Sequence, residues 1–441
     1  MVDQEARDKR RHTHGSSKKR DGSDSRTPAQ KDRDRVLYTS SFRRLAQVTQ
    51  VVAADTGHVF HNRLTHSLQV AQVGRRMAER LISLHREELQ VSTGLDPDVV
   101  EAACLAHDLG HPPFGHIAEE ELNGLAGEDI DGFEGNAQSF RIITRLSQHS
   151  PLHHGLNLTR ATLAAVLKYP WLRGKNPEKP KKWGAYASSQ KDFEFARELV
   201  SGAAERTIEA QLMDWADDVT YSAHDLDDFY RAGKIPLHLL ANRLYDAERA
   251  LFFETVQKRH AGEGGIWEDR DSLEEAFNEV IVGLFPLDTA YRGTWKERAR
   301  LRDFCSQLIG RFVGGTSVLV KSNGRAQIQI DQYRHLEVSM LKELTWSYII
   351  EAPSLVSQQY GQRRVIDKLF EIYWDAATKS NNLGIFPPYY RDPIEASKGD
   401  NQTIRRTIID LIAGMTEEQA LQVHNRLTGV SLGSGLEDLL L

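Results

Sequence analysis

Apolar residues recur every three or four positions along much of the chain, the spacing that puts them on one face of an α-helix. Residues 62–89 show this spacing in six side chains: Leu64, Leu68, Ala71, Met77, Leu81 and Leu84. A second helix is predicted over residues 96–110, with Pro97 in its first turn and Gly110 at its end. The two prolines just beyond Gly110 prevent the helix from continuing, because proline has no backbone N–H to donate.

The later part of the chain continues the helical pattern with one exception. Amphipathic helices are predicted over residues 205–233, 335–350 and 362–377. Between them, residues 317–331 read SVLVKSNGRAQIQID, in which two alternating runs flank Asn323-Gly324, a strong signal for a β-hairpin. The pattern therefore predicts one mainly α-helical body with a small β-hairpin.

The composition is that of an ordinary globular protein, with 40% apolar and 27% charged residues in a chain of 441. There is no apolar run long enough to span a membrane and no secretory signal, so we expect a cytoplasmic protein without membrane association. Cys104 and Cys305 are the two cysteines, which argues against a disulfide framework. Cys104 lies one helical turn before His107 and is interpreted as a small buried residue, not as a metal ligand.

Charge is spread unevenly along the chain. The net charge is −6, yet residues 1–35 hold 11 basic and 7 acidic residues. Residues 1–31 are interpreted as a disordered basic tail, because mixed charge with serine and glycine does not support a packed core. The rest of the chain is acidic, which disfavours non-specific binding of nucleic acid, since phosphate neutralisation supplies most of that affinity. Nucleic-acid binding therefore stays an open hypothesis for the basic tail, residues 1–31, and for no other segment.

The most distinctive stretch is AHDLGHPPFGHIAEE, which gathers histidines and carboxylates around a diproline turn. Its adjacent His107 and Asp108 can both bind one divalent metal, but two ligands are too few to hold an ion. His66 on the preceding helix and Asp217 on the long later helix would complete a set of two imidazoles and two carboxylates. Such a set suits Mn²⁺, Mg²⁺ or a related transition metal. Asp218, beside Asp217, leaves the fourth ligand open by one position.

Further segments accompany these residues in order from about residue 32 to residue 228. They read DRDRVLYTSSFRRLAQVTQVV, HNRLTHSLQVAQ, HDLGHPPFGHIAEE, FEGNAQSFRII, TLAAVLKYP and ADDVTYSAHDLDD. Together they resemble the deoxyguanosinetriphosphate triphosphohydrolase-like family of the HD superfamily of metal-dependent phosphohydrolases. The combination of GHPPFGH, EGNAQ and KYP is highly specific. Val48 departs from the pattern, since many members have lysine there, and this suggests a divergent branch.

The resemblance implies an all-α HD-domain fold. The HD phosphohydrolase core is expected over residues 32–235, with a helical C-terminal region over residues 236–441 packed on it. The implied reaction is hydrolysis of a deoxynucleoside triphosphate, dGTP or another, to deoxynucleoside and inorganic triphosphate, by attack of water at the α-phosphorus. Because members commonly form symmetric oligomers, we expect a homo-oligomer here. Some members are activated by a dNTP at a separate site, and whether such a dNTP activator acts on this protein stays open.

The resemblance also points to a proton donor. His116, the last histidine of GHPPFGH, is the candidate general acid/base for the leaving 5′-oxygen, a role that histidine suits near neutral pH. Whether it also handles the attacking water stays open. Glu119 lies three residues further on, on the same helix face, and would orient the imidazole and favour its charged form.

Seven more residues match family positions that contact the substrate. Gln50, Arg63 and His111 match contacts to the sugar or α-phosphate, Lys168 and Tyr169 match triphosphate contacts, and Tyr221 and Asp225 match contacts to a phosphate oxygen and the 3′-hydroxyl. Tyr221 and Asp225 follow Asp217 by four and eight residues, so all three project from one side of a helix. Lys182 is a weaker phosphate candidate, on a loop over residues 171–185 that is expected to be mobile.

Two other functions are compatible with an HD body. The first is another HD phosphohydrolase, a nucleotidase or phosphodiesterase, against which GHPPFGH and KYP argue because they suit a triphosphate pocket. The second is a non-catalytic protein that binds nucleotide or nucleic acid. The intact metal set and the His116–Glu119 pair argue against that loss of catalysis.

Overall fold

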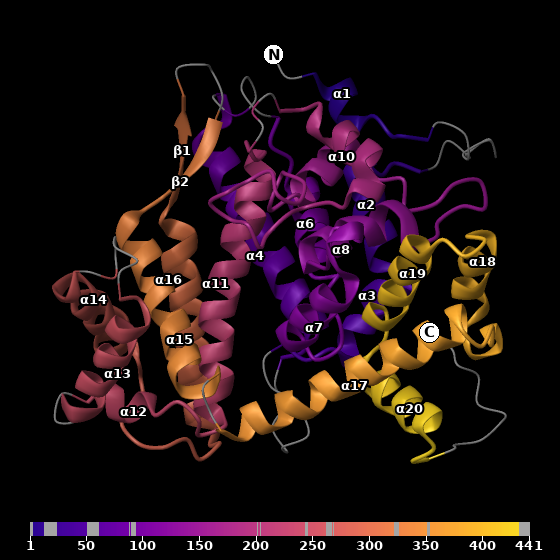
Figure 1. Ribbon diagram of the computed structural model, residues 1–441. Coiled ribbons are helices and arrows are strands. Elements are labelled where there is room, and N and C mark those ends of the chain that lie inside the picture. The colour runs from indigo at the N-terminus through magenta and orange to yellow at the C-terminus, as the bar shows by residue number, and fades with distance from the viewer. Residues whose placement is uncertain are drawn as a thin grey trace.

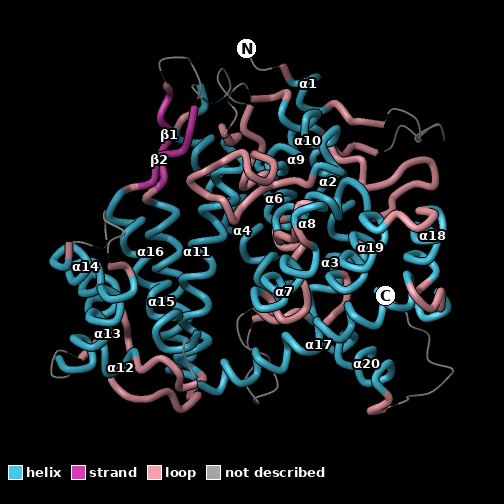
Figure 2. Tube along the Cα trace, viewed as in Figure 1, coloured by secondary structure: helices cyan, strands magenta, loops and turns pink. Residues whose placement is uncertain are grey.

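The computed structural model of the protein is mainly helical, with one small two-stranded sheet (Figures 1 and 2). The prediction of a mainly α-helical body is thus confirmed. None of the described helices has the length and apolar composition that a membrane crossing requires. Part of the expected tail (13–23) and the Asn323-Gly324 turn lie outside the described residues. The structure describes residues 3–12, 24–50, 61–87, 89, 94–200, 202, 204–242, 246–261, 267, 269–321, 326–350 and 353–431.

Three helices at the centre position the site. They are α4 (Arg63–Leu84), α6 (Pro97–Ala106) and α11 (Ile208–Arg231), and they pack on one another. Each begins at a side chain that accepts a hydrogen bond from a backbone N–H of the first turn, a group with no partner inside the helix. These capping residues are Asn62, Asp96 and Thr207.

The buried face of α4 differs in part from the predicted one. Met77 and Leu81 are buried as predicted, but Leu68 and Leu84 are 45% and 58% exposed. The face that packs on α6 and α11 includes the buried His66, a polar position that a count of apolar residues leaves out. His66 therefore points into the interior of the protein.

Further helices surround this centre. The remaining α-helices of the N-terminal half are α1 (Gln4–Asp8), α2 (Pro28–Leu37), α3 (Ser40–Arg44), α7 (His116–Ala126), α8 (Gly135–Arg141), α9 (Arg160–Val166) and α10 (Gln190–Arg197). Those of the C-terminal half are α12 (Leu237–Leu240), α13 (Asp246–Arg259), α14 (Arg270–Phe277), α15 (Trp295–Gly314), α16 (Gln332–Thr345), α17 (Pro353–Thr378), α18 (Pro388–Ala396), α19 (Asn401–Ala413) and α20 (Glu417–Thr428).

The buried apolar residues form two main clusters. The larger surrounds α4, α6 and α11 and includes residues of α15 and α16. The second joins α7 to α17, α19 and α20, and it includes Phe114 in the turn before α7. In Figure 1, α17 runs along the lower edge of the molecule, from the side of α15 and α16 to the side of α18 and α20. The C-terminal helices therefore pack directly on the segment that follows the His107-Asp108 pair.

The start of the chain is ordered against the body. The guanidinium of Arg7 forms a buried ion pair with Glu209 of α11 at 2.5 Å. Arg10 forms another with Asp32 at 2.6 Å. The prediction of a disordered tail is therefore wrong for residues 3–12, because their basic side chains are matched by carboxylates of the folded body.

The predicted hairpin is present in its two strands. β1 (Thr316–Val320) pairs with β2 (Ala326–Ile330) in antiparallel register, with Thr316 opposite Ile330 and Val320 opposite Ala326.

The loop over residues 171–185 is held together at its ends, in contrast to the mobile loop expected. The backbone N–H of Gly184 donates to the carbonyl of Trp171 at 2.9 Å. The indole N–H of Trp171 donates to the carbonyl of Lys182 at 2.7 Å. Lys182 therefore has a defined place beside the site.

Helix α8 packs closely against the turn at residues 107–110. A Cβ added to Gly110 would lie 2.1 Å from the carbonyl oxygen of Gly135 and 2.3 Å from the backbone nitrogen of Ser139. The Ser139 hydroxyl accepts from the Gly110 N–H at 2.8 Å and donates to the carbonyl of His107 at 2.7 Å. Gly110, the glycine of HDLG, thus allows the backbone of this turn to approach the backbone of α8 closely.

We predict that Gly110→Ala lowers the free energy of unfolding by about 3 kcal/mol, since both backbones would have to move. The matched control is Gly124→Ala in α7, where an added Cβ meets nothing within 4 Å and the change should stabilise the helix slightly. Urea unfolding followed by circular dichroism measures both variants. A wild-type midpoint for Gly110→Ala would contradict the close packing of α8.

Candidate active site

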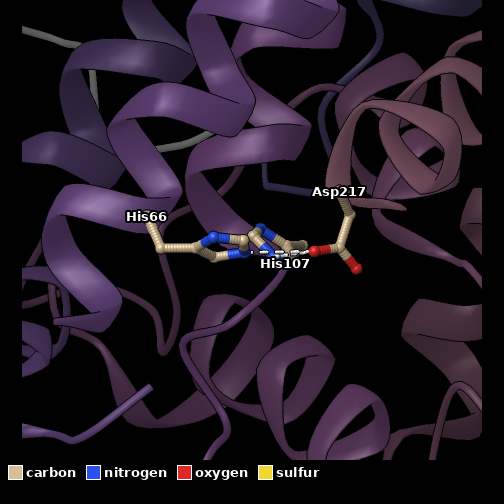
Figure 3. A group of neighbouring side chains, drawn as sticks. All are labelled: His66, His107 and Asp217. Carbon is tan, nitrogen blue, oxygen red and sulfur yellow. Dashed lines mark hydrogen bonds and ion pairs between the residues drawn. The ribbon is translucent and has the colours of Figure 1, made fainter. Parts of the chain in front are cut away.

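Three side chains from three helical regions converge on one point between α4, α6 and α11 (Figure 3). Each of His66, His107 and Asp217 offers one ligand atom, and these atoms all lie within 4.8 Å of one another. His66 Nε2 is 3.1 Å and His107 Nε2 is 3.6 Å from the same oxygen, Oδ1 of Asp217. The structure thus brings together three of the four predicted metal ligands.

The ring of His107 is oriented for binding a metal through Nε2. Its Nδ1 lies 2.6 Å from the carbonyl oxygen of Cys104, to which it donates. The other ring nitrogen, Nε2, is buried and has no hydrogen-bond partner among the described residues. A histidine whose Nδ1–H is fixed by a backbone carbonyl presents the lone pair of Nε2 to a cation. Cys104 is buried, as predicted, and it contributes its carbonyl to this arrangement.

The charges of the cluster also suit a cation. Burial opposes the charged imidazolium, but the carboxylates of Asp108 and Asp217 outweigh it and raise the pKa of His107 to about 9. Burial likewise opposes the Asp217 carboxylate, but the nearby Lys168 and His107 hold its pKa well below the usual value. Two imidazoles and a carboxylate form a donor set that divalent transition metals bind, and His107 would release its Nε2 proton when a cation binds. The residues therefore fit a divalent cation.

Asp108 lies at the edge of this group. Its Oδ1 is 3.4 Å from His107 Nε2, while its Oδ2 accepts from Arg63 Nη1 at 2.8 Å. Burial opposes its charge, but His107 and Arg63 hold the pKa of Asp108 well below its usual value. Asp108 is thus ionised beside the group, with one oxygen held by Arg63 and the other facing the histidines.

The geometry distinguishes Asp217 from its neighbour. Asp217 faces the two histidines, whereas Asp218 Oδ1 accepts a hydrogen bond from Lys342 of α16. Successive residues of an α-helix point about 100° apart, so only one of the two can face the histidines. The structure therefore favours Asp217, as the sequence pattern did.

His116 and Glu119 form a hydrogen-bonded pair at the start of α7. His116 Nδ1 is 2.9 Å from Glu119 Oε2, and the His116 side chain is 73% exposed. The other carboxylate oxygen, Oε1, accepts from the backbone N–H of Gly135 at 2.9 Å. Burial opposes the charge of Glu119, but the hydrogen bond from His116 and the charge of Lys182 hold its pKa well below the usual value. An ionised, fixed carboxylate therefore orients an accessible imidazole.

His111 lies between this pair and the group of predicted metal ligands, which we call the metal group (His66, His107 and Asp217, with Asp108 beside them). Its ring centroid is 5.8 Å from that of His116, and its Nε2 is 3.5 Å from Asp108 Oδ1. Burial and the nearby Arg63 lower the pKa of His111 to about 3, so the ring is neutral at physiological pH. Its Nδ1 is buried and has no hydrogen-bond partner among the described residues. This atom faces the backbone of Gly135, where an added Cβ would lie 2.6 Å from it.

Three more predicted contact residues hold a buried polar atom without a hydrogen-bond partner in the described part of the chain. These atoms are Oε1 of Gln50, Nε of Arg63 and Oδ2 of Asp225. Burial raises the pKa of Asp225 well above its usual value, so this carboxyl is neutral and can both donate and accept. Native proteins pair most buried polar groups, so such atoms indicate a place for a ligand.

Lys168 and its neighbours lie on the other side of Asp217. Lys168 Nζ is 2.8 Å from Oδ1 of Asp214 and 3.2 Å from Oδ2 of Asp217. Burial opposes its charge, but these two carboxylates raise the pKa of Lys168 well above its usual value. Tyr169 and Tyr221 are half-buried, and burial raises the pKa of both hydroxyls, which stay protonated.

Sequence reasoning missed two partners of these residues. Asp214, which pairs with Lys168, precedes Asp217 by three residues on α11, and that helical spacing was a usable signal. Glu134, in the EGNAQ motif, lies 3.0 Å from Lys182 Nζ, which is also 3.6 Å from Glu119 Oε1. Nothing in the sequence indicated that Glu134 would be buried beside Lys182.

We predict that Asp217→Asn abolishes Mn²⁺ binding, because it removes the carboxylate that both histidines face, whereas the matched control Asp218→Asn keeps it. Calorimetric titration of metal-stripped protein with Mn²⁺ measures the difference, and circular dichroism checks that both variants fold. Equal affinity in the two variants would rule out the three-residue group as the metal site.

Comparison with known proteins places these residues in a family. Residues 63–222 match the HD domain and residues 328–426 match the phosphohydrolase-associated domain. The deoxyguanosinetriphosphate triphosphohydrolase-like protein of Streptomyces coelicolor is 40% identical over 424 residues, 92% of this chain and 93% of the relative. Proteins of the same name from Bifidobacterium longum and Jannaschia sp. are each 32% identical, over 92% and 95% of this chain and 84% and 93% of the relatives. The chain therefore belongs to the deoxyguanosinetriphosphate triphosphohydrolase-like family of HD-domain phosphohydrolases.

Proposed function

We propose that this protein hydrolyses deoxynucleoside triphosphates to deoxynucleoside and inorganic triphosphate with the help of a divalent cation. The observation that carries the proposal is a chain of close contacts from the metal group to an exposed histidine. It runs from His107 through Asp108 and His111 to His116, with neighbouring groups 3.4 Å, 3.5 Å and, between ring centroids, 5.8 Å apart. His116, the proposed proton donor, is thus separated in space from Asp108 of the cation site by a single side chain, that of His111.

The cation would be held by His66, His107 and Asp217, with Asp108 beside them. When bound there, it supplies Lewis-acid polarisation of the α-phosphate and neutralises the charge that develops on its oxygens. Lys168 lies beside Asp217 and is charged, so it can bind an oxygen of the triphosphate. The neutral His111 lies between Asp108 and His116, and its ring would line the same end of the substrate site.

The chemical step breaks the bond between the α-phosphorus and the 5′-oxygen while water adds to the phosphorus. The departing 5′-oxygen needs a proton, and His116 is the exposed group positioned to donate it. Glu119 holds the ring through its hydrogen bond to His116 Nδ1, and Glu119 is itself fixed by the backbone N–H of Gly135. The products are then a deoxynucleoside with a free 5′-hydroxyl and an intact triphosphate, and the proton that the attacking water releases to solvent balances the one with which His116 is recharged.

The sugar would be selected at the far end of the site. Asp225 and Tyr221 follow Asp217 along the same side of α11, and the neutral carboxyl of Asp225 has a free oxygen for the 3′-hydroxyl. A close-fitting wall at C2′ would then disfavour ribose. This part of the proposal rests on helical spacing and burial.

We predict that the purified protein releases triphosphate when it is incubated with Mn²⁺ or Mg²⁺ and each dNTP, singly and mixed. Ion-exchange chromatography identifies the products, and EDTA should abolish the reaction, because phosphate polarisation requires the cation. Release of orthophosphate or a nucleoside monophosphate would instead identify another HD phosphohydrolase. Nucleotide binding without turnover under every mixture would indicate a non-catalytic protein.

We predict that His116→Ala lowers kcat by about 10²- to 10⁴-fold, the usual contribution of a general acid, while Mn²⁺ affinity is unchanged. The control is His154→Ala, an exposed histidine outside the site. Initial rates of triphosphate release and calorimetric Mn²⁺ titration measure the two properties separately. If His116→Ala turns over like wild type, another group protonates the leaving oxygen.

A further inference from the structure

Glu417, the first residue of α20, reaches from the C-terminal region into two segments of the site. Its Oε1 accepts from the backbone N–H of Thr49 at 2.9 Å and from that of Phe114 at 3.3 Å. Its Oε2 accepts from the hydroxyl of Thr49 at 2.7 Å. One carboxylate therefore binds three donors on two segments that are far from it in the sequence.

Both segments carry predicted contact or catalytic groups. Thr49 immediately precedes Gln50. Its backbone also pairs with that of Asn62, the residue that caps the start of α4. Phe114 lies two residues before His116, and α7 begins at His116 directly after this turn. A shift of either segment would move a group that the proposed reaction uses.

The turn before His116 needs external support. Phe114 has φ of +67°, a left-handed conformation that residues other than glycine rarely adopt. Such a conformation persists only where the surroundings hold it. Here the Phe114 side chain is buried in the cluster formed with α17, α19 and α20, and its N–H is bound by Glu417.

Arg44 forms a second set of hydrogen bonds between the C-terminal region and this turn. Arg44 donates from Nη1 to the carbonyl of Met415 at 3.0 Å, and from Nη2 to the carbonyls of Leu109 and His111, both at 2.8 Å. Met415 lies two residues before Glu417. The short connection between α19 and α20 is thus joined to both ends of the turn at residues 109–114.

We infer that Glu417 is a positioning residue for the reaction: it fixes the turn that presents His116 and the backbone that presents Gln50. This inference rests on the proposed function for its kinetic consequence, but the structural role of Glu417 can be measured without turnover. Neither the HD match nor the motifs include this residue, because it lies in the phosphohydrolase-associated region.

The test compares three variants of the full chain with wild type. Glu417→Ala removes all three hydrogen bonds and should lower kcat for triphosphate release by about 10- to 100-fold, the cost of misplacing a catalytic group by about 1 Å, with Mn²⁺ affinity unchanged. Glu417→Gln keeps an oxygen for both N–H groups and an amide for the Thr49 hydroxyl, so it should restore kcat to near the wild-type value. The matched control Glu418→Ala changes an exposed neighbour that bonds only Gln422 among the described residues, and it should behave like wild type.

Hydrogen–deuterium exchange separates this inference from the proposed function. Peptides that contain Thr49 and Phe114 should exchange faster in Glu417→Ala than in wild type, while peptides of α4 and α11 stay protected. If wild type releases no triphosphate but this local change is seen, the proposed function fails and the positioning role stands. If Glu417→Ala does not fold, Thr49→Val, which removes one bond, should still lower kcat and leave Mn²⁺ affinity intact. Wild-type kcat and wild-type exchange in Glu417→Ala, or in Thr49→Val where that variant must be used, would overturn the inference.

Discussion

The half-buried carboxylate of Asp217 is the constraint on which the rest of the site depends. It lies between two histidines on one side and Lys168 on the other, and each of these groups comes from a different segment of the chain. A negative charge in such a place is stable only with nearby positive charge, so the packing of α4, α6 and α11 and the chemistry of the site are coupled. A bound divalent cation would satisfy the same requirement.

The sequence was sufficient for the parts of the site that local rules determine. His107 and Asp108 are adjacent at a helix end, and His66 and Asp217 lie on helices whose amphipathic pattern is clear, so the metal group followed from motif and spacing. The spacing to Tyr221 and Asp225 favoured Asp217 over Asp218, and the structure agrees, since Asp217 lies on the side of α11 that faces α4. The face of α4 was predicted in part only, since Leu68 and Leu84 fit the apolar spacing but lie at the surface.

The parts that the sequence did not predict are contacts across long separations. Glu417 binds Thr49, which is 368 positions earlier in the chain, and no periodicity or motif relates the two. The second apolar cluster has the same character, because it joins α7 to helices near the C-terminus. Through these contacts the phosphohydrolase-associated region supports the turn before His116, the histidine proposed as proton donor.

The ordered start of the chain has a practical meaning for anyone who handles this protein. Arg7 and Arg10 neutralise Glu209 and Asp32, two carboxylates that are almost completely shielded from water. Trimming the chain to residue 28, as a design based on its composition would suggest, would leave both carboxylates without these guanidinium groups. An affinity tag is therefore better attached at the other terminus, and a shortened recombinant form should retain the first dozen residues.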